Sequence, residues 1–281
     1  KAKYNDSELR VGELWSNLPV TAIDASRQLI ASYQGLQFNH KVNDGLKFEL
    51  GRIEKFSSRF DEDFSDLSLT LNGQTNASSG LNYIDVRYKA TDNIDLEYYY
   101  GQLTDIFNQH YISVDYTKKF DQISSNTALK YFNTTETSDS KFQNIDNHNI
   151  GLIQRLEYQN HKFAVGYQQI SGDDPYPILD DFIPALYFIN WNITGFFKKD
   201  EKSWHFIYGY SFQDYLPGLT AVTKYSHGYD INRGDDLDKN SESELNLALN
   251  YNFQTPVLKD ISISYLFADY NVEYGNDFTE N

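Results

Sequence analysis

The sequence contains no cysteine and no methionine among its 281 residues. Without cysteine, neither disulfides nor thiolate metal sites can stabilise the chain. The six histidines are scattered and lack the spacing of a metal site. We therefore expect no cofactor and no bound metal. A chain that begins at Lys1 and lacks methionine is also expected to be a mature or internal piece of a longer protein.

Long hydrophobic runs are missing as well. The longest apolar stretch, near residues 182–191, is interrupted by Pro184. A membrane-spanning helix needs about 18 or more consecutive apolar residues. The sequence therefore excludes a helical membrane protein.

Basic residues are scarce, with 24 Lys and Arg against 40 Asp and Glu and a formal net charge of −16. Nucleic-acid binding requires clustered basic side chains, so no nucleic-acid partner is expected. Aromatic residues are abundant instead, with 23 Tyr and 19 Phe. So many aromatic residues in an acidic, hydrophilic chain favour a protein that has one apolar surface and one surface in contact with water.

Apolar and polar residues alternate with a period of two, which places opposite characters on the two faces of a β-strand. In residues 83–91, the clearest case, Ile84, Val86, Tyr88 and Ala90 share one face while Asp85, Arg87 and Lys89 share the other. The same pattern predicts about 13 strands, near 6–14, 31–41, 46–57, 80–91, 94–103, 110–118, 124–134, 148–158, 161–171, 203–213, 218–229, 242–253 and 260–272.

The predicted connections alternate in length along the chain. Short turns, such as 42–45 and 92–93, take turns with long segments at 15–30, 58–79, 104–109, 135–147, 172–202 and 230–241. Short turns at one end and long loops at the other are typical of outer-membrane barrels. In lipid, a sheet must close on itself to satisfy its backbone groups. The pattern therefore predicts an all-β fold, a transmembrane antiparallel β-barrel.

A soluble β-sandwich is the alternative fold. It explains less well why Arg87, Lys130, Arg155 and Lys224 recur in mid-strand.

The predicted strand count is odd, whereas single-chain bacterial barrels normally have even numbers of strands. Residues 275–281 look like the start of another outer loop, so we expect strands to be missing at both ends of the chain.

Residues 10–36, "RVGELWSNLPVTAIDASRQLIASYQGL", resemble the third-loop region of OprD-type porins. Further matches follow in order at 86–117, 163–177, 199–212, 216–231 and 256–270. The resemblance implies a single barrel domain over 1–281, part of a Gram-negative outer-membrane barrel with about 18 strands. It also implies that residues 15–30 and 172–202 fold inward to form a narrow eyelet.

Charges in such an eyelet set solute selectivity. On this resemblance, Asp24 and Arg27 would lie in the eyelet, although a local salt bridge between them is the alternative. A lumenal track of basic residues would comprise Arg87, Lys130, Arg155 and Lys224. Each of these could equally be a solvated charge balanced by an acid such as Asp85, Glu97 or Glu157.

The function expected from the resemblance is passive, selective diffusion of small polar nutrients, either amino acids or small carboxylates. Ser264 and Leu266 stand where many relatives carry arginines, so a chito-oligosaccharide channel is an alternative. Sugar rings would then stack on Tyr99, Tyr187, Phe188 and Trp191, although the last three could instead form a hydrophobic plug. Expected partners are small polar solutes, outer-membrane lipid and lipopolysaccharide, with the protein a monomer or loose trimer.

Two other functional classes remain open. The acidic residues of the outer loops would suit a receptor or adhesin. They could also steer cations toward the pore, or bind divalent cations that bridge them to lipopolysaccharide. These acidic residues are Asp61, Glu62, Asp63, Asp66, Asp173, Asp174, Asp180, Asp181, Asp235, Asp236, Asp238 and Glu242. Asp235, Asp236 and Asp238 lack the glycine and distal glutamate of a calcium loop, so no metal is assigned to them. An enzyme is not expected, because Ser226 and His227 are adjacent on a strand and must point to opposite faces.

Overall fold

The computed structural model describes residues 1–21, 30–58, 63–179, 187–189, 192, 195–234, 237–275 and 278–280. Within this part of the chain the structure contains 17 β-strands and no α-helix. Among the same residues, none forms a helix of the length and apolarity that crossing a membrane requires.

The strands, in chain order, are β1 (Ala2–Tyr4), β2 (Ser7–Leu14), β3 (Ser32–Lys41), β4 (Leu46–Ser57), β5 (Ser65–Leu71), β6 (Gln74–Ser78), β7 (Leu81–Thr91), β8 (Ile94–Leu103), β9 (Phe107–Phe120), β10 (Ile123–Glu136), β11 (Asp146–Tyr158), β12 (His161–Gly172), β13 (Lys202–Ser211), β14 (Leu219–Ile231), β15 (Asn240–Asn252), β16 (Ser262–Val272) and β17 (Phe278–Glu280).

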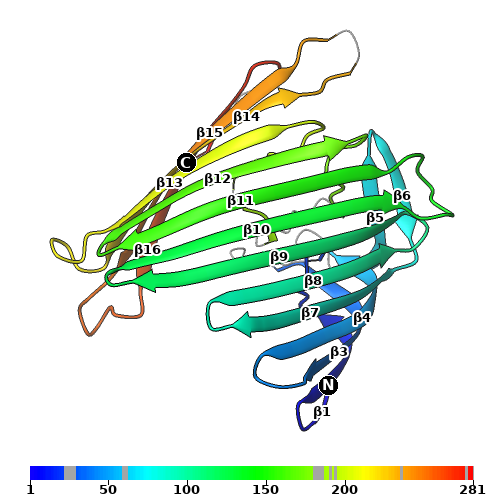
Figure 1. Cartoon of the computed structure of the whole chain (residues 1–281), viewed down its shortest axis with the longest axis horizontal. Helices are drawn as coiled ribbons and strands as arrows, with labels where there is room; N and C mark the ends of the chain where they lie inside the picture. The colour runs from blue at the N-terminus through cyan, green and yellow to red at the C-terminus, as the bar shows by residue number, and fades with distance from the viewer. Residues whose placement is uncertain are drawn as a thin grey trace. The chain divides into compact units, whose positions relative to one another are not determined.

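The chain forms two compact units. The first comprises residues 1–115, 129–150 and 170–188, and the second comprises 116–128, 151–169 and 189–281. In the first unit, β2 pairs with β3, β3 with β4, β4 with β7 and β7 with β8, all antiparallel. In the second unit, β12 to β16 pair in sequential antiparallel order, and β13 to β16 can be followed side by side in Figure 1.

Each strand predicted from the alternation overlaps an observed strand, but the expected count of about 13 was too low. Residues 58–79 were expected to be a loop, whereas β5 and β6 form a hairpin there. Asn72 and Gly73 turn this hairpin with φ angles of 50° and 78°, as a tight two-residue turn requires. The alternating Leu67, Leu69 and Leu71 are buried, which explains why the hairpin forms.

The expectation for the chain end was also wrong. Residues 275–281 were expected to begin an outer loop, but Phe278–Glu280 form β17, which pairs antiparallel with Ala268–Tyr270 of β16. The other strand that the pattern did not predict is β1, which pairs with β2. Both strands have only 3 residues, too few to display an alternating pattern.

The faces of the strands have the reverse polarity of a soluble protein. On β13, Phe206 is 50% exposed while its neighbour His205 is 0% exposed. On β14, Tyr225 is exposed and Lys224 is fully buried, and on β7 Tyr88 is exposed and Asp85 buried. Large apolar side chains thus cover the exposed face and polar groups gather on the other. A soluble sandwich would bury its apolar face, so this inversion argues against the sandwich.

Candidate functional site

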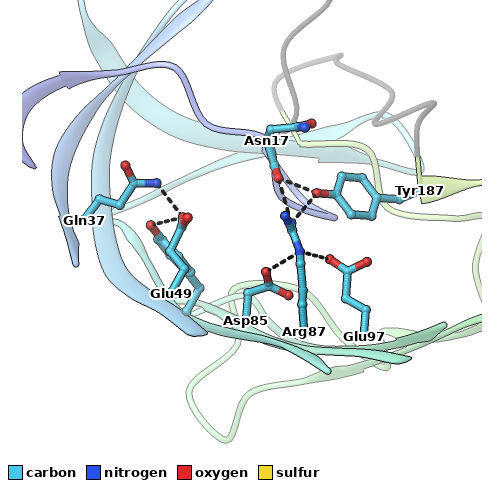
Figure 2. A network of polar contacts seen from close by, with 8 residues as sticks. Asn17, Gln37, Glu49, Asp85, Arg87, Glu97 and Tyr187 are labelled. Carbon is cyan, nitrogen blue, oxygen red and sulfur yellow. Dashed lines mark hydrogen bonds and ion pairs between the residues drawn. The ribbon is translucent and has the colours of Figure 1, made fainter. Parts of the chain in front are cut away.

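A polar network of the first unit surrounds Arg87 on β7. Asp85 lies two residues earlier on the same face, and Glu97 of β8 is the register partner of Arg87. The Arg87 Nε donates to Asp85 Oδ2 at 2.9 Å and to Glu97 Oε1 at 2.8 Å. The alternation along two paired strands therefore places one guanidinium between two carboxylates, as Figure 2 shows.

Two loop segments meet the same guanidinium. Arg87 Nη2 lies 3.1 Å from the Tyr187 hydroxyl and 3.4 Å from the backbone carbonyl of Asn17. The Tyr187 hydroxyl in turn donates to that Asn17 carbonyl. Arg87 thus joins the segment before β3 to the segment after β12 (Figure 2).

A third carboxyl group, that of Glu49 on β4, lies beside this network. Glu49 is the register partner of Asp85 and accepts hydrogen bonds from Tyr83 at 2.9 Å and from Gln37 at 2.5 Å. Asp85 Oδ1 is buried and has no hydrogen-bond partner among the described residues. An open pocket of about 310 Å³ is lined in part by Glu49, Asp85 and Arg87. A solute in this pocket would meet the Arg87 guanidinium and the ammonium groups of three lysines together with four carboxyl groups, those of Asp6, Glu8, Glu49 and Asp85.

Aromatic packing holds the Tyr187 segment in place. The Tyr187 ring packs edge-on against Tyr111, with centroids 5.5 Å apart, and Phe188 stacks on Phe132 at 4.8 Å. Burial raises the pKa of the Tyr187 hydroxyl, with Arg87 opposing the effect, so the hydroxyl stays protonated and able to donate. The segment therefore combines an apolar anchor with a polar tip.

The remaining predicted residues of the first unit have structural contacts. Lys130 donates to the Phe188 carbonyl at 3.1 Å, which fastens the same loop segment to β10. Tyr99 is 0% exposed and stacks on Tyr83 with centroids 6.3 Å apart. A fully buried ring offers no face to a solute in this conformation.

In the second unit, Lys224 and Arg155 lie in separate contacts. Lys224 on β14 is fully buried and donates from Nζ to Asn192 Oδ1 at 2.6 Å. Asn192 also donates to Ser226 Oγ at 3.1 Å, and Ser226 bonds His205 rather than His227. Arg155 on β11 donates to Asn126 Oδ1 at 2.8 Å.

Three predicted site residues, Asp24, Arg27 and Trp191, lie outside the described residues. The sequence reasoning missed other contributors, namely Asn17, Glu49 and Asn192. Asn17 acts through its backbone carbonyl and Asn192 through a contact across the fold, and neither leaves a sequence signal. Glu49 sits on the predicted polar face of β4, so pairing β4 with β7 would have revealed it.

Comparison with known proteins agrees with this architecture. The family of outer membrane porins called OprD matches residues 1–281. The crystal structure of Acinetobacter baumannii OccAB4 is 49% identical with a TM-score of 0.94, covering 99% of this chain and 70% of that chain. The crystal structure of Pseudomonas aeruginosa OccK2 (OpdF) in complex with glucuronate has a TM-score of 0.92 at 23% identity, covering 99% of this chain and 76% of that chain. At that identity the likeness shows the fold alone.

Porin D of Pseudomonas aeruginosa is 27% identical over 292 residues, which cover 93% of this chain and 64% of Porin D. The chain thus spans less than two thirds of that relative. These relatives are β-barrel porins, passive channels of the outer membrane. They confirm the predicted fold class, the outer-membrane location and the expectation that the protein is not an enzyme. The chain belongs to the OprD family of outer membrane porins.

Proposed function

We propose that this porin mediates passive, selective diffusion of small polar solutes and favours amino acids over dicarboxylates. The supporting observation is the composition of the Arg87 network. One guanidinium, 34% exposed, faces the carboxyl groups of Asp85 and Glu97, with Glu49 beside Asp85. Acidic groups outnumber the basic group at this place, and the whole chain has a formal charge of −16.

This arrangement suits solutes that carry an ammonium and a carboxylate together. The ammonium group can approach the carboxyl groups of the pocket while the carboxylate approaches the exposed part of Arg87. Beside Arg87 a dicarboxylate would meet more repulsion than attraction, because Asp85, Glu97 and Glu49 outnumber the one guanidinium there. Charges that line a narrow channel set its selectivity.

We also propose that residues 15–30 and 172–202 form the constriction, with Asp24 and Arg27 contributing charge to it. The contacts of Asn17 and Tyr187 with Arg87 support this role. The sugar channel has less support, since Tyr99, Tyr187 and Phe188 are all buried. On the outside, the exposed apolar strand faces would contact outer-membrane lipid and lipopolysaccharide.

The test compares Arg87→Gln with Lys89→Gln, which removes the same charge from the same strand. Lys89 pairs with Asp92 at a short turn and has no part in the Arg87 network. Reversal potentials are measured in planar bilayers with the full-length protein. Arg87→Gln should raise the cation-to-anion permeability ratio about fivefold, as roughly 1 kcal/mol of lost repulsion predicts. Lys89→Gln should leave the ratio nearly unchanged.

Liposome swelling then ranks the solutes. Lysine and alanine should enter faster than glutarate and chitobiose, and Glu97→Gln should reduce the advantage of lysine. If Arg87→Gln and Lys89→Gln had the same cation-to-anion permeability ratio, Arg87 would not be part of the constriction. Fastest entry of chitobiose would replace the proposed substrate class with sugars.

A further inference from the structure

A second polar cluster, in the second unit, fastens the segment before β13 to the strands beside it. Lys198 in that segment forms an ion pair from Nζ to Glu242 Oε2 on β15. Tyr270 of β16 donates to the same oxygen at 2.6 Å. Glu201 accepts the backbone N–H of Lys198 at Oε2, at 3.0 Å. Glu242 and Tyr270 lie near the ends of β15 and β16, and Lys198 and Glu201 lie in the segment just before β13.

Two oxygens in this cluster have no donor. Glu201 Oε1 and Glu242 Oε1 are buried and have no hydrogen-bond partner among the described residues. Glu201 and Glu242 are only 1% and 2% exposed, so water does not solvate them. The Glu201 carboxyl packs so closely on Gly228 of β14 that a Cβ at that position would collide with it. Burying an unsatisfied carboxylate is costly, so these two orphan oxygens require an explanation.

The charges in the cluster do not balance, because two carboxyl groups face one ammonium group. A bound metal ion would not explain the two oxygens that lack a donor, because the Lys198 ammonium group already lies beside these carboxyl groups. Moreover, the described chain contains no group of three or more potential metal-ligating acids, histidines or cysteines. A proton on Glu201 would instead supply the missing donor for both oxygens. Burial, and next the proximity of Glu242, raise the pKa of Glu201 well above its ordinary 4.5.

The other titratable groups of the surrounding strands have their own partners. On β14, Lys224 bonds Asn192 and Asp230 pairs with Lys202. On β13, His205 bonds Ser203 and Ser226, and on β15 Glu244 accepts from Asn246. Lys198 and Tyr270 are therefore the groups that face the carboxyl pair.

We propose that Glu201 and Glu242 share one proton and that this pair is a pH-sensitive latch, which holds the segment 195–201 against β14 and β15. Because the pKa of Glu201 is raised in the folded protein, the stabilisation is complete in acid and is lost as pH rises through that raised pKa. Above it, two buried negative charges repel each other and the segment is released. This regulation does not depend on which solute the channel passes.

The decisive measurement is an infrared difference titration of the full-length protein in detergent, which follows the protonated carboxyl band between acid and alkaline pH. We expect one carboxyl group that titrates far above pH 4.5. The band should disappear in Glu201→Gln and should titrate at lower pH in Glu242→Gln, which removes the neighbouring charge but not the burial of Glu201. It should persist in Glu157→Gln, a matched control whose carboxylate forms an exposed pair with Lys162.

Hydrogen exchange provides the second readout. After correction for intrinsic rates, exchange of the Lys198 amide should accelerate at least tenfold across the transition in the native protein. It should stay level in Glu201→Gln, because the amide side chain supplies a permanent donor. Absence of a high-titrating carboxyl in the native protein would overturn the proposal. So would a titration that persists in Glu201→Gln or that shifts when a metal chelator is added.

Discussion

The hydroxyl of Tyr187 donates a hydrogen bond to the backbone carbonyl of Asn17, although the two residues are 170 positions apart in the chain. Both atoms also lie within reach of the Arg87 guanidinium. One side chain of β7 therefore ties together two loop segments through three contacts, which would hold both segments in place in the proposed constriction.

Tyr187→Phe should loosen this junction while preserving its packing against Tyr111. The Asn17 carbonyl and one Arg87 nitrogen each lose the hydroxyl as a hydrogen-bond partner. This loss should lower the free energy of unfolding by about 1 kcal/mol. We expect larger current fluctuations in the open channel, measured in single-channel recordings. The control is Tyr176→Phe, which removes a buried hydroxyl bonded to Gln109 in the same loop region. Equal noise in both variants would contradict the role of Tyr187.

Val165→Arg tests the outward face of the second unit. Val165 is 45% exposed and pairs in register with Phe206, which is 50% exposed. If this face meets hydrocarbon, an arginine here should reduce the free energy of unfolding by about 2–4 kcal/mol. Tyr215→Arg, at an exposed turn, should cost no more than about 1 kcal/mol. Chemical unfolding in lipid vesicles measures both, and a neutral Val165→Arg would mean that water covers this face.

Lys224→Met tests whether the buried lysine is a structural group. Its fully buried Nζ donates to Asn192 Oδ1, so its removal should leave that part-buried acceptor without its shorter hydrogen bond and lower the free energy of unfolding by about 1–3 kcal/mol. Lys162→Met removes an exposed lysine paired with Glu157 and should cost less than about 1 kcal/mol. Urea unfolding of both variants gives the comparison. Equal losses would show that Lys224 is not part of the fold's polar framework.

The alternation of single side chains was enough to predict most of the strands. At 83–91 the sequence places Asp85 and Arg87 on one face and Ile84 and Tyr88 on the other, and the structure confirms both assignments. The prediction failed where alternation was overlooked or too short to detect. The β5–β6 hairpin carried both alternating leucines and an Asn-Gly turn, so its signal was present. The strands β1 and β17 left none.

The sequence by itself determined the period-two pattern and the polar or apolar character of each strand face, because these depend only on neighbouring residues along one chain. Only the tertiary structure decided which charges meet. Arg87 contacts Glu97 because strand register places the two residues opposite each other. It contacts Asn17 and Tyr187 because two loop segments pack against β7. Likewise, Glu201 meets Glu242 only because the segment before β13 lies against β15. Such contacts join distant positions, and their energies depend on burial that no local pattern encodes.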